Sequence, residues 1–273
     1  MAAEVFAPAK INLTLHVTGR RSDGYHLLDS LVVFADTGDQ LRLEPGPELA
    51  LEVSGLFANG VPADQRNLVW KAAAGAGWTG RISLSKHLPH GAGIGGGSSD
   101  AAAVLRAVAA EGRNIPEALP LSLGADVPVC MKARAARMQG IGEQVAAADL
   151  PELHALLVNP GAHVPTGPVF SALACRDNPP MPQDIPAFTS AEDCAAWLQE
   201  QRNDLEAPAC ALAPVIDRTL SDLRSSRNAL MARMSGSGAT CFALYPTKKA
   251  AHMAAYEIGA EHSDWWCSAV TLT

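Results

Sequence analysis

The chain has 273 residues, 48% of them hydrophobic, and 21 Lys and Arg against 28 Asp and Glu give a formal net charge of −7. This composition is typical of a globular protein with one large or two ordinary domains. The acidic balance argues against a general nucleic-acid binder, because such proteins carry a basic surface that neutralises phosphates. No apolar run of about 18 residues occurs, and residues 1–10 lack the pattern of a signal peptide. We therefore expect a cytoplasmic protein with no nucleic-acid and no membrane partner.

The six cysteines are scattered, without a C-x-x-C pair and without a histidine at zinc-ligand spacing. We expect reduced and mostly buried thiols with no disulfide and no metal role. They are Cys130, Cys175, Cys194, Cys210, Cys241 and Cys267.

The first part of the chain is rich in predicted strands. Apolar and polar residues alternate from Ile11 to Val17, which predicts a strand with one buried face. A helix is predicted to begin near Asn67, where an apolar stretch starts. Further strands are predicted over residues 30–34, 40–43, 49–53 and 81–85.

A glycine-rich loop follows the last of these strands. It runs through G-A-G-I-G-G-G at residues 91–97 and leads into an alanine-rich helix predicted over residues 101–110, with Gly112 as its C-terminal cap. The local order is therefore strand, glycine loop, helix.

Beyond Leu150 the chain becomes richer in proline. The apolar patterns predict strands over residues 155–158, 241–245 and 268–272, and helices over residues 191–201, 208–223 and 248–259. We place a domain boundary near residue 153, which predicts an N-terminal domain over residues 1–153 and a C-terminal domain over residues 154–273.

The glycine loop matches two known nucleotide-binding patterns only in part. Gly91, Gly93 and Gly96 satisfy G-x-G-x-x-G, but a helix-forming run precedes Glu111, where a dinucleotide-binding unit needs a second strand. The P-loop pattern fails because Gly97 stands where its lysine is required.

The physical properties of the loop nevertheless favour an anion site. Glycines let the backbone approach a ligand closely, and the first turn of the following helix offers free N–H groups and a partial positive charge. The alternative is a flexible loop in which Ser98 or Ser99 merely caps the helix. A phosphate site here needs Mg²⁺ and a lysine from another element, for which Lys10 is a candidate.

Several segments together resemble the GHMP kinase family of galactokinase, homoserine kinase and mevalonate kinase. They are P-A-K-I-N-L from Pro8, R-S-D-G-Y-H from Arg21, the glycine loop with S-S-D-A-A, L-G-A-D-V-P from Leu123, N-D-L-E from Asn203 and S-G-S-G from Ser235. The resemblance spans nearly the whole chain. It implies an α+β fold with an N-terminal domain like the second domain of ribosomal protein S5 and a ferredoxin-like C-terminal domain.

The resemblance also implies the activity. We expect an enzyme that uses ATP as co-substrate, with Mg²⁺, to phosphorylate a hydroxyl of a cytidylylated sugar alcohol, acting as a monomer or weak homodimer. One alternative is another GHMP kinase that acts on homoserine or a mevalonate. A second is a non-catalytic nucleotide sensor on the same fold, which has no need of Lys10 or a catalytic aspartate.

Residue roles follow from the matched positions. Asp126 matches the family's catalytic base and Lys10 the lysine that pairs with it. Tyr25 and His26 match residues that bind a cytosine. The resemblance assigns ATP binding to Asn67, Leu68, Lys86, Pro89, Gly91, Ala92, Gly93, Ile94, Gly95, Gly96, Gly97, Ser98 and Ser99. It assigns substrate binding to Asn12, Tyr25, His26, Thr166, Phe170, Gly236, Ser237 and Gly238, and it names no metal ligand beyond a contact from Ser98 or Ser99.

Overall fold

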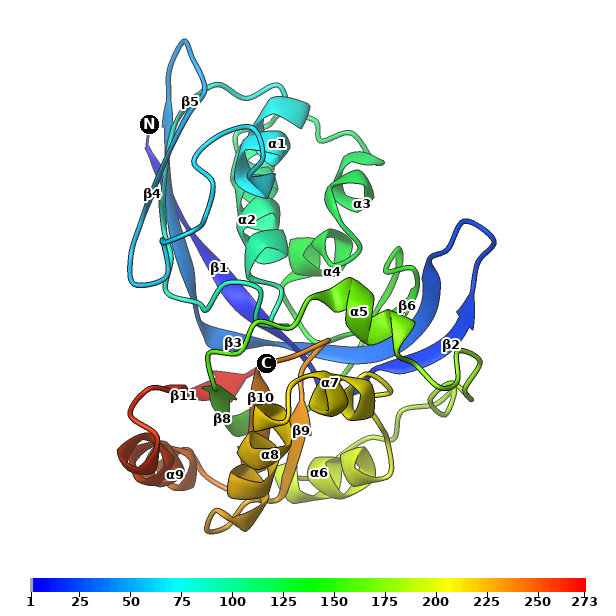
Figure 1. Ribbon diagram of the computed structural model, residues 1–273. Helices are drawn as coiled ribbons and strands as arrows, with labels where there is room; N and C mark the ends of the chain where they lie inside the picture. Colours follow the sequence, from blue (N-terminus) through cyan, green and yellow to red (C-terminus); the bar gives the residue numbers. More distant parts are fainter. Residues whose placement is uncertain (1) are drawn as a thin grey trace. The chain divides into compact units, whose positions relative to one another are not determined.

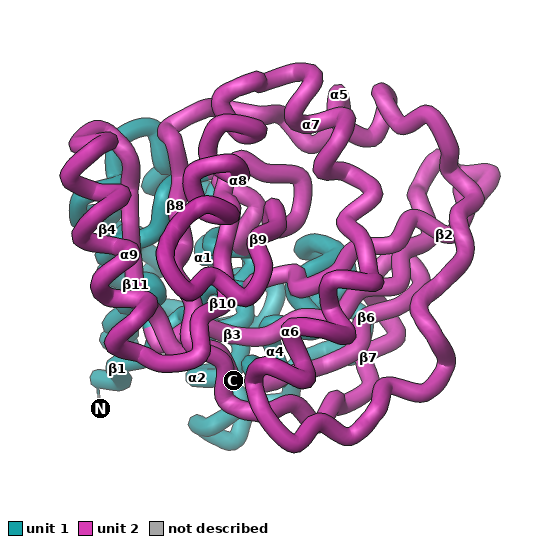
Figure 2. The backbone as a smooth tube through the Cα atoms, turned by 90° about the horizontal axis from the view of Figure 1, so that it is seen from below, with its two compact units in different colours: residues 1–10, 37–90, 95–133 teal, residues 11–36, 91–94, 134–273 magenta. Residues whose placement is uncertain are grey.

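The computed structural model describes residues 2–273, and the chain forms two compact units (Figures 1 and 2). Unit 1 comprises the residues up to Lys10, residues 37–90 and residues 95–133. Unit 2 comprises residues 11–36, 91–94 and 134–273. The units are therefore assembled from interleaved segments, whereas the boundary near residue 153 divides the chain once and stays a prediction. Two strands, β1 (Ala3–Asn12) and β3 (His26–Pro45), contribute residues to both units.

In unit 1 a small sheet is packed with four helices. Strand β5 (Gly80–Ser85) pairs in parallel with β4 (Ala50–Ser54) and antiparallel with the second half of β3. The helices are α1 (Leu68–Gly75), α2 (Gly96–Ala110), α3 (Leu119–Leu123) and α4 (Val127–Lys132), and α2 packs against the other three (Figure 1). Most of α2 is buried, because its alanines let neighbouring helices approach closely.

In unit 2 an antiparallel sheet has the order β11 (Trp266–Leu272), β8 (Leu153–Asn159), β10 (Cys241–Tyr245) and β9 (Met231–Met234). Helices α8 (Val215–Ser225) and α9 (Lys248–Glu261) pack on this sheet. The first half of β3 pairs with β2 (His16–Arg20) and with β6 (Ala136–Gly140), and β6 pairs with β7 (Gln144–Ala147). The remaining helices are α5 (Thr166–Ser171), α6 (Ala191–Gln199) and α7 (Glu206–Leu212).

The predicted α+β class is confirmed, but the strand predicted from Ile11 to Val17 is wrong in two ways. It is interrupted, since β1 ends at Asn12 and β2 begins at His16. Its polar residues do not face solvent either, because Asn12, Thr14 and His16 are all buried. Each finds a polar partner inside unit 2, for example Ser30 Oγ for the Asn12 amide, and such partners allow polar side chains to be buried.

The helix predicted over residues 208–223 is two helices in the structure. Helix α7 ends at Leu212, and α8 begins after Pro214. Proline lacks the N–H that a helix interior needs, and it is tolerated only at a helix start. The helix after the glycine loop begins at Gly96, earlier than its alanine-rich core indicates, so part of the loop is itself the first turn of α2.

Within residues 2–273, no helix combines the length and the apolar composition that crossing a bilayer requires. The six cysteines, all in the described part of the chain, are free thiols; Cys130, Cys194 and Cys241 are buried, Cys210 and Cys267 are half-buried, and Cys175 is exposed. Burial raises the pKa of the Cys130 and Cys194 thiols to about 12, so both stay protonated at neutral pH.

We predict that Gly38→Ala lowers the free energy of unfolding by about 1–3 kcal/mol, because overpacking costs that much. A Cβ at Gly38 in β3 would lie 2.2 Å from the Ala7 carbonyl oxygen and 2.7 Å from Phe6 Cζ. Gly259→Ala is the matched control: it lies within α9, has open space around it, and is expected to raise stability by about 0.5–1 kcal/mol. Urea denaturation checks both, and equal stability of Gly38→Ala and wild type would contradict the packing argument.

Candidate active site

Lys10 and Asp126, both in unit 1, form an ion pair with 3.0 Å between Lys10 Nζ and Asp126 Oδ2. The Lys10 side chain is 4% exposed and that of Asp126 is 31% exposed. A buried ammonium group needs an anionic partner, and the carboxylate supplies it. Asp126 stands just before α4, but within the described chain its carboxylate makes no capping bond to that helix. The pair thus leaves a partly accessible carboxylate beside a buried lysine.

Gly95 connects this pair with the start of α2. Its φ of +63° is left-handed, and a Cβ there would lie 3.1 Å from both Cβ and Cε of Lys10. Only glycine fits both the conformation and the space. The Lys10 side chain therefore runs along the backbone of the glycine loop.

The first turn of α2 carries Gly96, Gly97, Ser98 and Ser99. Gly95 is the N-cap and no side chain caps the helix among the described residues, so the alternative in which a serine caps α2 is wrong. The N–H groups of a first helical turn have no partner within the helix, and the helix dipole places partial positive charge there. Lys10 and the first turn of α2 thus both place positive charge at this point of unit 1, and the anion site stays a prediction.

Lys86 lies beneath the same turn, between two aspartates. It follows β5, its side chain is 4% exposed, and its Nζ donates to Asp39 Oδ2 and, at 2.7 Å, to Asp100 Oδ2. Asp39 also accepts hydrogen bonds from the backbone N–H groups of His87 and Leu88. The cluster ties β3, the exit of β5 and the first residues of α2 together. The ammonium group of Lys86, a predicted ATP-binding residue, is thus paired with two carboxylates.

Burial and charge pairing act in opposite directions on the pKa values of this cluster. Burial alone lowers the pKa of Lys86, but the Asp100 and Asp39 carboxylates outweigh it and the pKa is raised. Burial raises the pKa of Asp100, and the neighbouring Lys86 only partly opposes this. Lys86 is therefore charged at neutral pH.

Three other predicted ATP-binding residues lie elsewhere in unit 1. Asn67 caps α1, since its Oδ1 accepts a hydrogen bond from the Val69 N–H at 2.9 Å. Leu68 begins α1, and its Cδ1 would lie 3.8 Å from a Cβ on Gly97, so it borders the first turn of α2. Pro89 is half-buried in the segment between β5 and the loop.

In unit 2 the other part of the glycine loop packs against the second glycine motif. A Cβ on Gly93 would lie 2.6 Å from the Ser235 carbonyl oxygen, and one on Gly236 would lie 2.7 Å from the Gly93 carbonyl oxygen. Ser235 Oγ donates to the Gly93 carbonyl oxygen at 3.0 Å, and the Thr240 N–H donates to that of Ala92 at 3.1 Å. Backbone thus lies directly on backbone, which excludes side chains at these glycines.

Predicted substrate residues are joined to this motif by hydrogen bonds. The Asn12 N–H donates to Ser235 Oγ at 3.1 Å, and Thr166 Oγ1 and Ser237 Oγ are 2.9 Å apart. The amide of Asn203 donates to the carbonyl oxygens of Met234 and Gly236. Hydrogen bonds from Asn12, Thr166 and Asn203 therefore fix the position of the glycine motif that includes residues 235–238.

The residues predicted to bind a base lie at one place in unit 2. His26 and Phe170 are stacked, with ring centroids 4.7 Å apart, and Tyr25 is 59% exposed. Among the residues that the structure describes, His26 Nε2 is buried without a hydrogen-bond partner. Burial, followed by the charges of Arg20 and Arg176, lowers the pKa of His26. A neutral imidazole can donate one hydrogen bond and accept another, as recognition of a base requires.

Four residues around the site were missed by the sequence interpretation: Asp39, Asp100, Ser235 and Asn203. Asp100 and Ser235 adjoin predicted residues within recognised motifs, and Asn203 lies in N-D-L-E, which carried the resemblance but received no role. Asp39 had no sequence signal, since its partners are distant in the chain. Around the described site, no group of three or more His, Cys, Asp or Glu side chains is arranged to hold a metal ion.

The chain is similar to known proteins over almost its whole length. The family model for the GHMP kinases N terminal domain matches residues 67–148, and that for the GHMP kinases C terminal matches residues 185–263. A 4-diphosphocytidyl-2-C-methyl-D-erythritol kinase of Dinoroseobacter shibae is 58% identical over 98% of this chain and 94% of its own length. One from Cereibacter sphaeroides is 58% identical over 96% of each chain. A crystal structure of 4-(cytidine 5'-diphospho)-2C-methyl-D-erythritol kinase superposes with a TM-score of 0.79, at 35% identity over 99% of both chains.

We predict that Gly97→Ala weakens ATP binding without weakening the fold. Gly97 is exposed in the first turn of α2, and a Cβ there would approach protein atoms only at 3.8 Å. The methyl group would stand where phosphates reach the N–H groups, so KM for ATP should rise at least about tenfold, the effect of about 1.4 kcal/mol. Steady-state kinetics and a thermal melt check this. An unchanged KM for ATP would place the phosphates elsewhere.

Proposed function

Because the chain belongs to the GHMP kinase family, we propose that it transfers the γ-phosphoryl group of ATP to the 2-hydroxyl of 4-diphosphocytidyl-2-C-methyl-D-erythritol. The products are the 2-phosphate and ADP, in the non-mevalonate route to isopentenyl diphosphate. The observation that carries this proposal is the ion pair of Lys10 and Asp126 beside the first turn of α2. The choice of substrate is supported by the two relatives that are 58% identical to this chain, because both are named as kinases of that substrate.

Asp126 is the proposed base. Its carboxylate is partly exposed, so a hydroxyl group can reach it, and the proton of the 2-hydroxyl passes to it as the oxygen attacks the γ-phosphorus. A bond from the alcohol oxygen to phosphorus forms, and the bond from phosphorus to the oxygen bridging to the β-phosphate breaks. That bridging oxygen leaves with ADP.

Lys10 stabilises the charge of the transferring group. Its Nζ is already paired with the Asp126 carboxylate, and it supplies positive charge to the phosphoryl oxygens. The backbone N–H groups at the first turn of α2 hold the phosphates of ATP. Since Gly95 fixes the course of the Lys10 side chain, the lysine is placed before the substrates arrive.

Mg²⁺ is expected with ATP, and the residues at this turn fit it. Ser99 Oγ and Asp100 Oδ1 are buried and without a hydrogen-bond partner in the described chain, and oxygen atoms are the ligands that Mg²⁺ prefers. When bound, the ion would neutralise charge on the phosphates. These two oxygens are the proposed protein ligands.

The cytosine end of the substrate is recognised in unit 2. The exposed ring of Tyr25 and the ring of Phe170 offer faces for stacking, and the unpartnered Nε2 of His26 offers a hydrogen bond. Asn12, Thr166 and the motif at Gly236–Gly238 are the proposed contacts to the remainder of the substrate.

We also propose that the protein acts in the cytoplasm as a monomer or weak homodimer, with small molecules as its only ligands. The net charge of −7 supports the absence of a nucleic-acid partner. Size-exclusion chromatography with light scattering tests the assembly, and a stable larger oligomer would contradict it.

ADP release tests the proposed reaction. With Mg²⁺-ATP, we expect turnover with the diphosphocytidyl methylerythritol and none with methylerythritol phosphate, homoserine or mevalonate. Turnover with one of the other alcohols would overturn the substrate assignment. Binding of both nucleotides without any turnover would favour the sensor.

Asp126→Asn should lower kcat by at least about 100-fold, the usual contribution of a general base, with KM values changed only a few-fold. The amide keeps the shape and can still contact Lys10, but it cannot accept the proton. Steady-state kinetics at saturating ATP provide the measurement, and near-normal turnover would exclude Asp126 as the base.

A further inference from the structure

The segment of residues 178–183 in unit 2, N-P-P-M-P-Q, has no helix or strand of its own. We call it the proline-rich segment. Its three prolines lack backbone N–H groups, so it cannot be held by a regular ladder of backbone hydrogen bonds. Side chains from other elements must fix its position.

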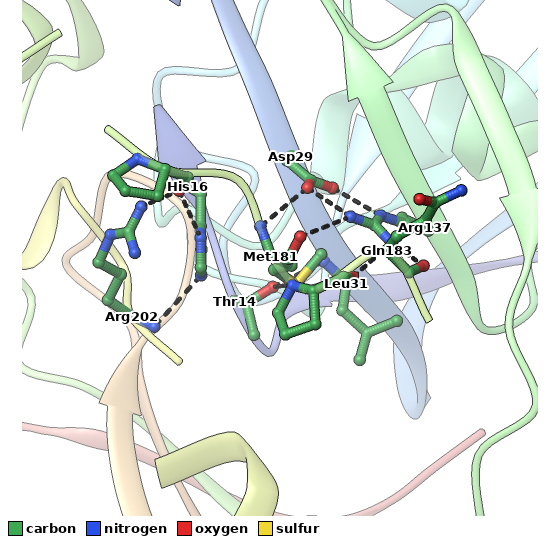
Figure 3. Close-up of polar contacts among 10 residues, drawn as sticks. Thr14, His16, Asp29, Leu31, Arg137, Met181, Gln183 and Arg202 are labelled. Carbon is green, nitrogen blue, oxygen red and sulfur yellow. Dashed lines mark hydrogen bonds and ion pairs between the residues drawn. The ribbon is translucent and has the colours of Figure 1, made fainter. Parts of the chain in front are cut away.

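Arg137 and Asp29 hold the second half of this segment (Figure 3). Arg137 Nε and Nη2 donate to the two carboxylate oxygens of Asp29 at 2.8 and 2.6 Å. The remaining capacity of the guanidinium is used by carbonyl oxygens of the segment: Nη1 donates to Pro182 and Gln183, and Nη2 donates to Met181. Asp29 in turn accepts a hydrogen bond from the Met181 N–H at 3.0 Å.

This ion pair is built into the sheet. Arg137 on β6 is opposite Leu31 on β3, so Asp29 is its diagonal neighbour on the same face, within reach of a long side chain. The side chains are 2% exposed for Asp29 and 12% exposed for Arg137. Hydrogen bonding to Asp29 raises the pKa of Arg137, which stays charged. A planar fork that bonds a carboxylate and three carbonyl oxygens is a geometry that lysine cannot reproduce.

A second set of contacts holds the first half of the segment. Arg202 donates to the Pro179 carbonyl oxygen, which His16 Nδ1 also contacts at 3.3 Å (Figure 3). The Asn178 N–H donates to the Val17 carbonyl oxygen on β2 at 3.0 Å, and its amide reaches Asp204. The proline-rich segment is thus fixed at both ends.

The segment is the continuation of the chain that carries Phe170. After α5 ends at Ser171, Leu173 enters the core of unit 2, and the chain reaches the proline-rich segment a few residues later. The ring stacked on Phe170 is that of His26, which stands on β3 together with Asp29. Asp29 thus lies on the strand that carries His26, and the proline-rich segment that the ion pair holds lies on the chain that continues from Phe170.

We propose that Arg137 and Asp29 are positioning residues for recognition of the cytosine: by holding the proline-rich segment they keep Phe170 in place against His26. This role rests on the proposed function, in which the stack of His26 and Phe170 receives the base. The pair does not touch the reacting groups. It sets the affinity for the cytidylyl part of the substrate and leaves phosphoryl transfer unchanged.

The test is Arg137→Lys, which keeps the charge and removes the fork. KM for the diphosphocytidyl methylerythritol should rise about tenfold, within the range that loss of base stacking produces, while kcat and KM for ATP stay within about twofold. Arg81→Lys is the matched control, because Arg81 forms an exposed ion pair with Glu52 in unit 1 and should leave all three constants unchanged. Equal losses in both KM values, or a loss confined to kcat, would overturn the proposal.

A double-mutant cycle separates positioning from general destabilisation. If Arg137 acts through Phe170, then Arg137→Lys in a Phe170→Ala background should change the substrate KM by less than about twofold, because coupled residues are not additive. Full additivity of the two effects would overturn the proposal. Should Arg137→Lys fold poorly, Asp29→Asn keeps an oxygen for the Met181 N–H, and it should raise the same KM by a smaller factor.

Calorimetric titration with CDP alone gives a readout that is independent of turnover. Arg137→Lys should weaken CDP binding by the same factor as the KM, and unchanged CDP binding would contradict the assignment. Wild-type protein that turns over the cytidylylated substrate keeps the proposed function in place whatever these variants do. If the wild-type protein shows no such turnover, the proposed function itself is wrong. Failure of the proposed function and failure of the positioning role are therefore distinguishable.

Discussion

The charge of Lys10 has to be compensated inside the protein, and the carboxylate of Asp126 in unit 1 compensates it. Its side chain is almost fully buried, and an unpaired ammonium group in that environment costs several kcal/mol. Asp126 supplies the compensating charge from the start of α4, and Gly95 supplies the space along which the lysine runs. Because a residue with a Cβ does not fit beside the lysine stem, the same constraint explains a left-handed glycine at the point where α2 begins.

Buried ion pairs recur as the means of fixing irregular backbone. In unit 1 Lys86 with Asp39 and Asp100 holds the exit of β5 and the first turn of α2, and in unit 2 Arg137 with Asp29 holds the proline-rich segment. Such pairs add little net stability, because desolvation offsets much of the attraction. They do fix geometry, since removing one partner leaves a buried charge. The Lys86 cluster and the Arg137–Asp29 pair each hold backbone that is close in the chain to proposed binding residues.

The sequence predicted the α+β class, the glycine loop and the helix after it, and several elements with accurate bounds, such as β10. The sequence-based prediction of buried and exposed residues failed where burial depends on partners from distant segments and not on neighbours in the chain. Ile11 to Val17 alternates in polarity, yet Asn12, Thr14 and His16 are buried because they find partners on distant segments. The ATP-binding role predicted for Lys86 stays a prediction, and the structure adds that the carboxylates of Asp39 and Asp100 enclose its ammonium group.

By itself, the sequence determined what is encoded locally. Glycines specify where backbone can turn left-handed or approach closely, prolines specify where helices stop, and motifs in a fixed order specify the family. Only the tertiary structure decided which charges meet. The resemblance implied that Lys10 pairs with Asp126, but nothing in the sequence indicated that Lys86 pairs with Asp39 or that Arg137 pairs with Asp29, since these partners are far apart in the chain. No local pattern carries that information, because the energy of a buried charge depends on its final surroundings.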